Sequence, residues 1–187
     1  MIGPFFNPDQ RSAAIAHFDE TGHVGLADSY SADIADAAAS QAYTLLARGR
    51  MNRGPEHNAY YLSGMPQPTQ QPELRTVVDA IQEAASLLGR DLRTDEPNTR
   101  IRALLLEMGR NVTGDLHIDQ KVRQAVGITT LRGMSDLWFP NGSNDGVTYT
   151  LEPGAVVVHD AERELPHRGS NGPEAERTGL TLIRQLA

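Results

Sequence analysis

Residues 152–182 read EPGAVVVHDAERELPHRGSNGPEAERTGLTL, and this stretch carries the strongest structural signal in the chain. It opens with a Pro-Gly turn, continues as a run of valines and contains two histidines, His159 and His167. A turn followed by β-branched residues is typical of a buried strand. The stretch therefore predicts a strand that ends at His159, with a second histidine shortly after it.

The same alternation of short apolar runs and turns extends back to about residue 100. We expect strands over 100–108, 116–119, 125–131, 137–139, 147–151, 155–159 and 178–186, although the apolar run at 100–108 would also suit a helix. Turn clusters separate several of them, at 111–114, 141–146 and 152–154. Short strands joined by tight turns predict a sandwich or barrel. Residues 99–187 are thus the expected β core.

Residues 1–98 are predicted to be mostly helical after a short extended start. A short apolar segment at 23–28 precedes Ser31, which is a natural cap for a helix reaching about Leu46. A second apolar stripe predicts a helix over 72–88. The intervening residues 49–71 are rich in Gly, Pro, Asn and Gln, so we expect a long loop that serves as a lid or binding loop. The helices should cover one outer face of the strands, within a single domain of 187 residues.

Composition excludes several classes of function. The 17 basic and 24 acidic residues give a net charge of −7, which disfavours nucleic acid as a partner. The absence of cysteine excludes disulfides, thiolate metal sites and cysteine nucleophiles. No apolar run reaches the ~18–20 residues that span a bilayer, and no secretory signal opens the chain. We expect a cytoplasmic protein without a membrane partner.

His-x-Asp occurs twice, and its two side chains share one face when it lies on a strand. The pair His17 and Asp19 precedes the first turn and is read as a surface or helix-end feature. The pair His117 and Asp119 begins the strand series. With a distant histidine it would form a two-histidine, one-carboxylate site, which leaves three positions open on Fe(II) for substrate and oxygen. By spacing alone, the third ligand is either His159 or His167.

The residues from 152 onward resemble the closing segment of the Fe(II)/2-oxoglutarate-dependent oxygenases. Members show a Pro-Gly turn, an apolar strand, a histidine often followed by Arg or Gly, and an arginine about ten residues later that opens the last strand. The start of the chain, HFDETGHVGLADSYSADIADA, also resembles the superfamily's turn, strand and first helix. The resemblance covers residues 13–46 loosely and 100–186 more closely. It implies an α+β, mainly β fold: a double-stranded β-helix, or jelly roll, with N-terminal helices packed on one sheet.

The resemblance also implies roles for individual residues. His117, Asp119 and His167 would be the iron ligands, and Arg177 would pair with the distal carboxylate of 2-oxoglutarate, the cosubstrate used with O2. Many members have a serine two residues after this arginine, whereas this chain has Gly179. Thr181, or Thr129 or Thr130 on an earlier strand, would supply the missing hydroxyl. Because Asp119 is present, hydroxylation or a related oxidation is favoured over halogenation.

The substrate is expected to be a small molecule, such as an amino acid or a natural-product intermediate. The candidate substrate-binding residues are Trp138, Arg132 and Tyr61. Arg132 is the weakest of these candidates. Because 16 of the 17 basic residues are arginine, any single arginine says little about a binding site. Two alternatives stay open: a cupin-type metalloenzyme that uses no 2-oxoglutarate, and a non-catalytic jelly-roll binding module. The oligomeric state is also open, with a homodimer among the options.

Overall fold

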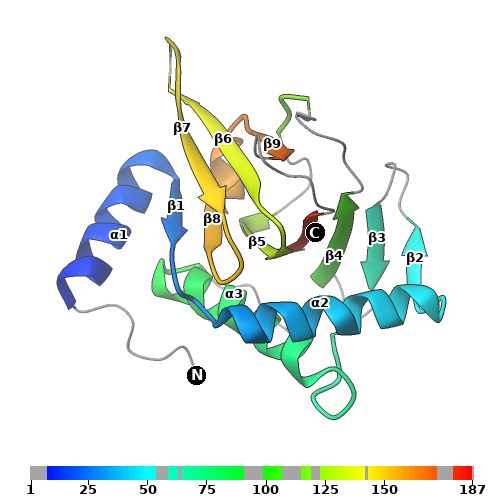
Figure 1. Ribbon diagram of the computed structural model, residues 1–187. Coiled ribbons are helices and arrows are strands. Elements are labelled where there is room, and N and C mark those ends of the chain that lie inside the picture. Colours follow the sequence, from blue (N-terminus) through cyan, green and yellow to red (C-terminus); the bar gives the residue numbers. More distant parts are fainter. Residues whose placement is uncertain are drawn as a thin grey trace.

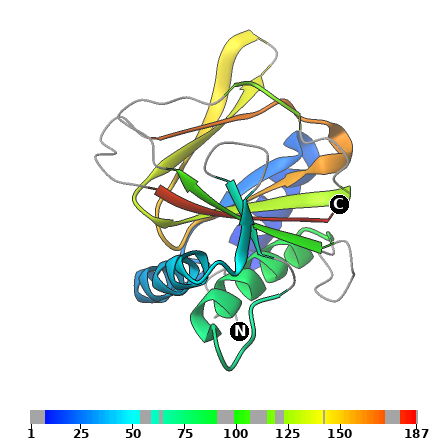
Figure 2. The ribbon, with the colours of Figure 1, turned by 90° about the vertical axis from the view of Figure 1, so that its right-hand side faces the viewer.

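Two antiparallel sheets face each other, and helices cover the outer face of the larger sheet (Figures 1 and 2). The computed structural model describes residues 8–53, 59–62, 65–90, 99–106, 115–118, 123–141, 143–171 and 179–186. The large sheet has the order β1 (His23–Leu26), β8 (Val156–Asp160), β5 (Arg123–Arg132), β10 (Gly179–Leu186), β4 (Thr99–Leu106), β3 (Ala59–Leu62) and β2 (Met51–Arg53). The small sheet has the order β7 (Ser143–Leu151), β6 (Ser135–Asn141) and β9 (Arg168–Asn171).

The helices α2 (Ala32–Ala47) and α3 (Pro72–Leu87) pack together beneath the large sheet. Ser31 caps α2 as expected, since its hydroxyl accepts a hydrogen bond from the backbone N–H of Ile34 at 3.3 Å. Pro72 occupies the first turn of α3, where its missing N–H costs nothing. Both predicted helices are therefore present, each with ends within a residue or two of the expected ones.

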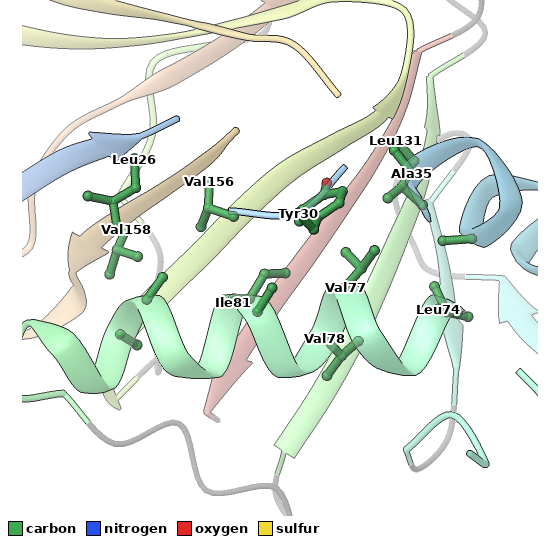
Figure 3. Packing of buried hydrophobic residues seen from close by; sticks show 14 of the residues in the cluster. Leu26, Tyr30, Ala35, Leu74, Val77, Val78, Ile81, Leu131, Val156 and Val158 are labelled. Carbon is green, nitrogen blue, oxygen red and sulfur yellow. The ribbon is translucent and has the colours of Figure 1, made fainter. Parts of the chain in front are cut away.

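One face of α3 fills the space beneath the sheet (Figure 3). Its buried residues are Leu74, Val77, Val78, Ala80, Ile81, Ala84 and Ala85. They meet Leu131, Val156 and Val158 from β5 and β8 in one apolar cluster. Burying a Val, Leu or Ile side chain contributes about 1.5–3 kcal/mol, so this layer is a major source of stability.

A second apolar cluster lies between the two sheets. It consists of Val126, Ile128, Leu137, Phe139, Leu151, Val157 and Ala161. On β5 and β8 these residues alternate with those that face the helices. The large sheet is thus apolar on both faces, and the interior of the roll is defined by the face that carries Val126 and Ile128.

Several expectations for the first part of the chain are wrong. The extended segment expected at 23–28 is present as β1 (His23–Leu26), but the helix α1 (Pro8–Thr21) before it was not predicted. Within the predicted loop 49–71, β2 and β3 form strands that pair with each other, and β3 pairs with β4. Residues 54–58 and 63–64 of that segment lie outside the described residues. Strands from the first part therefore extend the same sheet as strands from the second.

The strand expectations for the second part hold with two exceptions. The short strand β9 was not predicted, and it pairs with β6. The strand predicted at 116–119 is reduced, within the described residues 115–118, to an isolated bridge at His117. Across the parts of the chain that the structure describes, none of the helices has the length and apolar character needed to cross a bilayer.

Candidate metal centre

A backbone bridge joins His117 to His167 beside the small sheet. The N–H of His117 donates to the carbonyl of His167 at 3.0 Å, and the N–H of His167 donates back at 2.9 Å. His167 immediately precedes β9, so the bridge continues that strand's edge. Two histidines that are remote along the chain are thus fixed directly opposite each other. His167 is buried, with 2% of its surface exposed, whereas His117 is exposed.

The two imidazole rings have the spacing of neighbouring ligands on one metal ion. Their centroids are 4.5 Å apart and their planes are inclined by 56°. A metal bound to a ring nitrogen at about 2.1 Å lies about 3.2 Å from the ring centroid. With the two metal–nitrogen bonds at right angles, the centroids would be about 4.5 Å apart. The observed centroid distance allows both rings to bind one ion.

Backbone carbonyls select the tautomer of both rings. Nδ1 of His117 lies 2.9 Å from the carbonyl oxygen of Asp115, and Nδ1 of His167 lies 3.0 Å from that of Leu165. A carbonyl oxygen can only accept, so each Nδ1 must carry the proton and donate. In a neutral ring the proton on Nδ1 leaves a lone pair on Nε2, which is the form that binds metals. Both rings are therefore in the tautomer that binds a metal through Nε2.

Asp119 and Arg177 lie outside the described residues. Their predicted roles, as third ligand and as partner of the 2-oxoglutarate carboxylate, stay predictions. Within the described ranges, no three His, Asp or Glu side chains are arranged to hold a metal ion. A third protein ligand for His117 and His167 would have to come from elsewhere in the chain.

The interior wall next to His167 contains Phe139, which the sequence analysis did not assign, and His159, its alternative third ligand. Phe139 on β6 lies 5.6 Å from the His167 ring, and His159 on β8 lies 4.6 Å from it, between ring centroids. His159 and His23 are register partners across β8 and β1, so they share the inner face. His23 stacks on Phe139 at 4.2 Å. The candidate centre is therefore backed by a row of rings formed by Phe139, His159 and His23.

Tyr149 links this row to α1. Its hydroxyl lies 2.8 Å from Nδ1 of His23 and 3.2 Å from Nε2 of His17. Burial lowers the pKa of His23 to about 4, with a contribution from the neighbouring charges of His17 and His159, and burial raises that of Tyr149 to about 12. His23 is thus neutral at neutral pH. Of the two interpretations offered for His17, the helix-end one fits, because His17 lies near the end of α1 and is half-buried there.

Thr129 does not face the interior of the roll, so its expected role in cosubstrate binding is not supported. Its hydroxyl donates to the carbonyl of Ala155 at 2.5 Å and also bonds the hydroxyl of Tyr30, within the helix-side layer. Thr130 instead shares the inner face with Ser135, and their hydroxyl oxygens are 2.5 Å apart. Thr130 is also the register partner of Thr181 on β10, whose side chain is not described.

Two of the three predicted substrate-binding residues are engaged elsewhere. Arg132 pairs with Asp36 on α2 at 2.6 Å, which also lowers the pKa of that carboxyl group through the hydrogen bond. Trp138 alternates with the inward-facing Leu137 and Phe139, and the guanidinium of Arg168 lies 4.4 Å from its ring centroid. Both side chains have other partners in this structure, and their roles in substrate binding stay predictions. Tyr61 lies on β3 opposite Arg102 in register, and its side chain is outside the described residues.

No family model and no curated protein matches the sequence. Solved structures do match. A prolyl-4-hydroxylase from Pseudomonas putida superposes with a TM-score of 0.64 and 17% identity, over 94% of this chain and 98% of that one. A member of the 2OG-Fe(II) oxygenase family from Burkholderia pseudomallei gives 0.54 and 14%, over 96% and 90%. This chain has the double-stranded β-helix of those oxygenases.

A further match to this oxygenase fold comes from nogalamycin biosynthesis. The α-ketoglutarate-dependent epimerase SnoN has a TM-score of 0.70 and 16% identity, over 97% of this chain and 83% of that one. A second SnoN structure contains Fe3+ and α-ketoglutarate. The fold predicted from the resemblance is thereby confirmed. At sequence identities this low, the matches establish the fold of this chain.

Proposed function

We propose that this chain is an Fe(II)- and 2-oxoglutarate-dependent dioxygenase that oxidises a C–H bond of a small molecule, most simply by hydroxylation. The observation that supports it best is the pair His117 and His167, whose rings are 4.5 Å apart with both Nδ1 atoms committed to carbonyls. Two neutral imidazoles and one carboxylate suit ferrous iron and leave positions for a chelating cosubstrate and oxygen. Asp119, two residues after His117, is the proposed carboxylate.

The iron, with 2-oxoglutarate and O2 bound, would supply the oxidising chemistry. The chain's own residues would bind, orient and exclude water. His117 and His167 would hold the metal through Nε2. The apolar wall formed by Ile128, Leu137 and Phe139 would keep the space behind the metal dry. A dry pocket strengthens the pairing of a guanidinium with the distal carboxylate, which we assign to Arg177.

Thr130 and Ser135 are the better candidates for the hydroxyl partner of that carboxylate. Both are buried and both lie on the inner face. The pair carries two O–H groups, and the bond between the two oxygens uses one hydrogen. The other hydrogen would donate to the cosubstrate. Thr181, the register partner of Thr130, is the other hydroxyl candidate.

A second candidate function is a cupin-type metalloenzyme without 2-oxoglutarate. The observation behind it is that His159 lies as close to His167 as His117 does, at 4.6 Å against 4.5 Å, although within the described residues these three histidines are not arranged around one ion. A histidine-rich centre of this kind would leave fewer positions for a chelating cosubstrate. The two candidates differ in whether 2-oxoglutarate reaches the metal.

Anaerobic titration distinguishes them. Fe(II) followed by 2-oxoglutarate should produce a weak visible charge-transfer band, and aerobic incubation should yield succinate with a panel of amino acids and small metabolites. Iron binding without the band supports the cupin-type candidate. No iron binding at all supports a jelly-roll binding module and contradicts both enzyme proposals.

A further inference from the structure

His159 is a buried polar residue that directly follows three buried valines on β8. It follows Val156, Val157 and Val158 on β8, and only 1% of its surface is exposed. On the inner face its neighbours along β5 and β8 are Val126 and Val157. Buried polar side chains are far rarer than buried aliphatic ones in such a position. The position therefore invites a functional explanation.

The ring of His167 needs more than one contact to keep a fixed direction. The hydrogen bond from Nδ1 to the carbonyl of Leu165 selects the tautomer, but the ring's terminal torsion is broad. Rotation about that torsion would sweep Nε2 along an arc. A ligand must be held within about 10–20° of its productive direction. The faces of the ring therefore have to be supported by neighbouring side chains.

Three rings surround His167: His117 at 4.5 Å, His159 at 4.6 Å and Phe139 at 5.6 Å between centroids. His117 is exposed and is itself a proposed ligand. Of the two buried rings, His159 makes the closer contact, with an interplanar angle of 49°. It is thus the strongest candidate for the fixed support of the ligand.

The backbone around His159 is held on both sides. In register it lies opposite His23 on β1 and Val126 on β5. The next residue, Asp160, pairs with Arg90 at 2.5 Å and accepts from the N–H of Glu162 at 3.0 Å. A side chain anchored in this way can transmit its position to a neighbour.

We propose that His159 is a positioning residue, whose imidazole packs against that of His167 and keeps Nε2 directed at the metal. The inference rests on the proposed function, because it requires a metal at His167. A role as an additional ligand is disfavoured, since the described residues contain no group of three side chains placed to bind one ion.

The test compares three variants with the wild-type chain. His159→Val removes the ring and keeps a strand-forming apolar residue, and His159→Phe keeps a ring without nitrogen. Val157→Ala is the matched control, because Val157 is equally buried in the same strand and on the same inner face. Each protein is titrated with Co(II), its visible absorption spectrum is recorded, and its thermal stability is measured.

His159→Val should weaken Co(II) binding by about 10- to 100-fold, as is typical when support of a metal ligand is lost, and should alter the visible bands. His159→Phe should retain most of the affinity, and Val157→Ala should bind as the wild type does at reduced thermal stability.

The proposal is overturned if His159→Val binds like the wild type, or if Val157→Ala loses as much affinity. It is equally overturned if His159→Phe is as weak as His159→Val, because the nitrogen would then be a ligand. Failure of the wild-type chain to bind any metal would instead refute the proposed function.

Discussion

Thr129 and Thr130 are adjacent on β5, yet their hydroxyls serve opposite faces of the large sheet. Thr129 bonds Tyr30 and the carbonyl of Ala155 beneath the sheet, whereas Thr130 bonds Ser135 inside the roll. Both threonines were candidates from the sequence. Neighbouring residues on a strand point to opposite faces, but the sequence does not show which face is the inner one until the partner sheet is known. A difference of one position separates a packing residue from a candidate cosubstrate contact.

This pair gives a matched test of the cosubstrate site. Thr130→Val should weaken 2-oxoglutarate binding by about 10- to 100-fold, because a hydrogen bond to a charged group contributes about 1.5–3 kcal/mol. Thr129→Val should leave that affinity unchanged and lower the free energy of unfolding by about 1–3 kcal/mol, since it leaves buried polar partners unsatisfied. Calorimetric titration and urea unfolding measure the two effects. Equal affinities in both variants would refute the assignment of Thr130.

His23 makes the fold sensitive to acid. Its pKa is about 4 in the folded chain against 6.5 as the ordinary value, so between these values the unfolded chain binds more protons. Stability is therefore lost as the pH falls from 6.5 towards 4, by up to about 1.4 kcal/mol per pH unit. His23→Phe keeps a ring to stack on Phe139 and should flatten this dependence. Urea unfolding across that pH range measures it, and parallel curves for the two proteins would contradict the prediction.

The elements that the sequence predicted well are those with local signals. Ser31 and Pro72 mark the starts of α2 and α3, and the apolar stripe of α3 continues to its end. The strands β4 to β8 and β10 were likewise predicted, from short apolar runs and the turn clusters between several of them. The helix α1 lacks such a stripe, and β2 and β3 lie in a segment whose Gly and Pro content favours a loop. Their pairing with the large sheet is a tertiary effect that local composition does not encode.

The ring of Tyr149, on β7, lies directly against Gly25 on β1. A Cβ atom at this position would lie 2.6 Å from Cδ1 of the tyrosine ring. Gly25→Ala should therefore displace Tyr149 from His23 and destabilise the fold by about 1–3 kcal/mol. Gly169→Ala on β9 is the control, since the nearest atom to its added carbon is 4.0 Å away. Thermal unfolding measures both, and an equal effect would show that Tyr149 does not depend on this close approach.

At the scale of the whole molecule, the chain does not separate into a helical half and a β half. The strand β1 pairs with β8, and β3 pairs with β4. The helices α2 and α3 share one core cluster with strands of the second part. We therefore expect one cooperative unfolding transition, with equal calorimetric and van't Hoff enthalpies. Differential scanning calorimetry tests this, and two resolved transitions would contradict a single domain.

The candidate site could be predicted only in part for the same reason. The His-x-Asp spacing and the histidine after the Pro-Gly turn indicated His117 and His167, which the backbone bridge then brings together. The contribution of Phe139 and His159 depends on which faces of β6 and β8 meet inside the roll. The register between distant strands determines which faces meet, and this register cannot be predicted from any short stretch of sequence.

The central claim is that His117 and His167 bind one ferrous ion. Anaerobic Fe(II) titration, followed by metal analysis after gel filtration, tests it most directly. We predict one iron per wild-type chain and a loss of affinity of at least about 100-fold in His117→Ala and in His167→Ala. His17→Ala, whose ring bonds Tyr149 at 3.2 Å, is the control and should retain one iron. Retention of tightly bound iron in the double variant lacking both His117 and His167 would contradict the account.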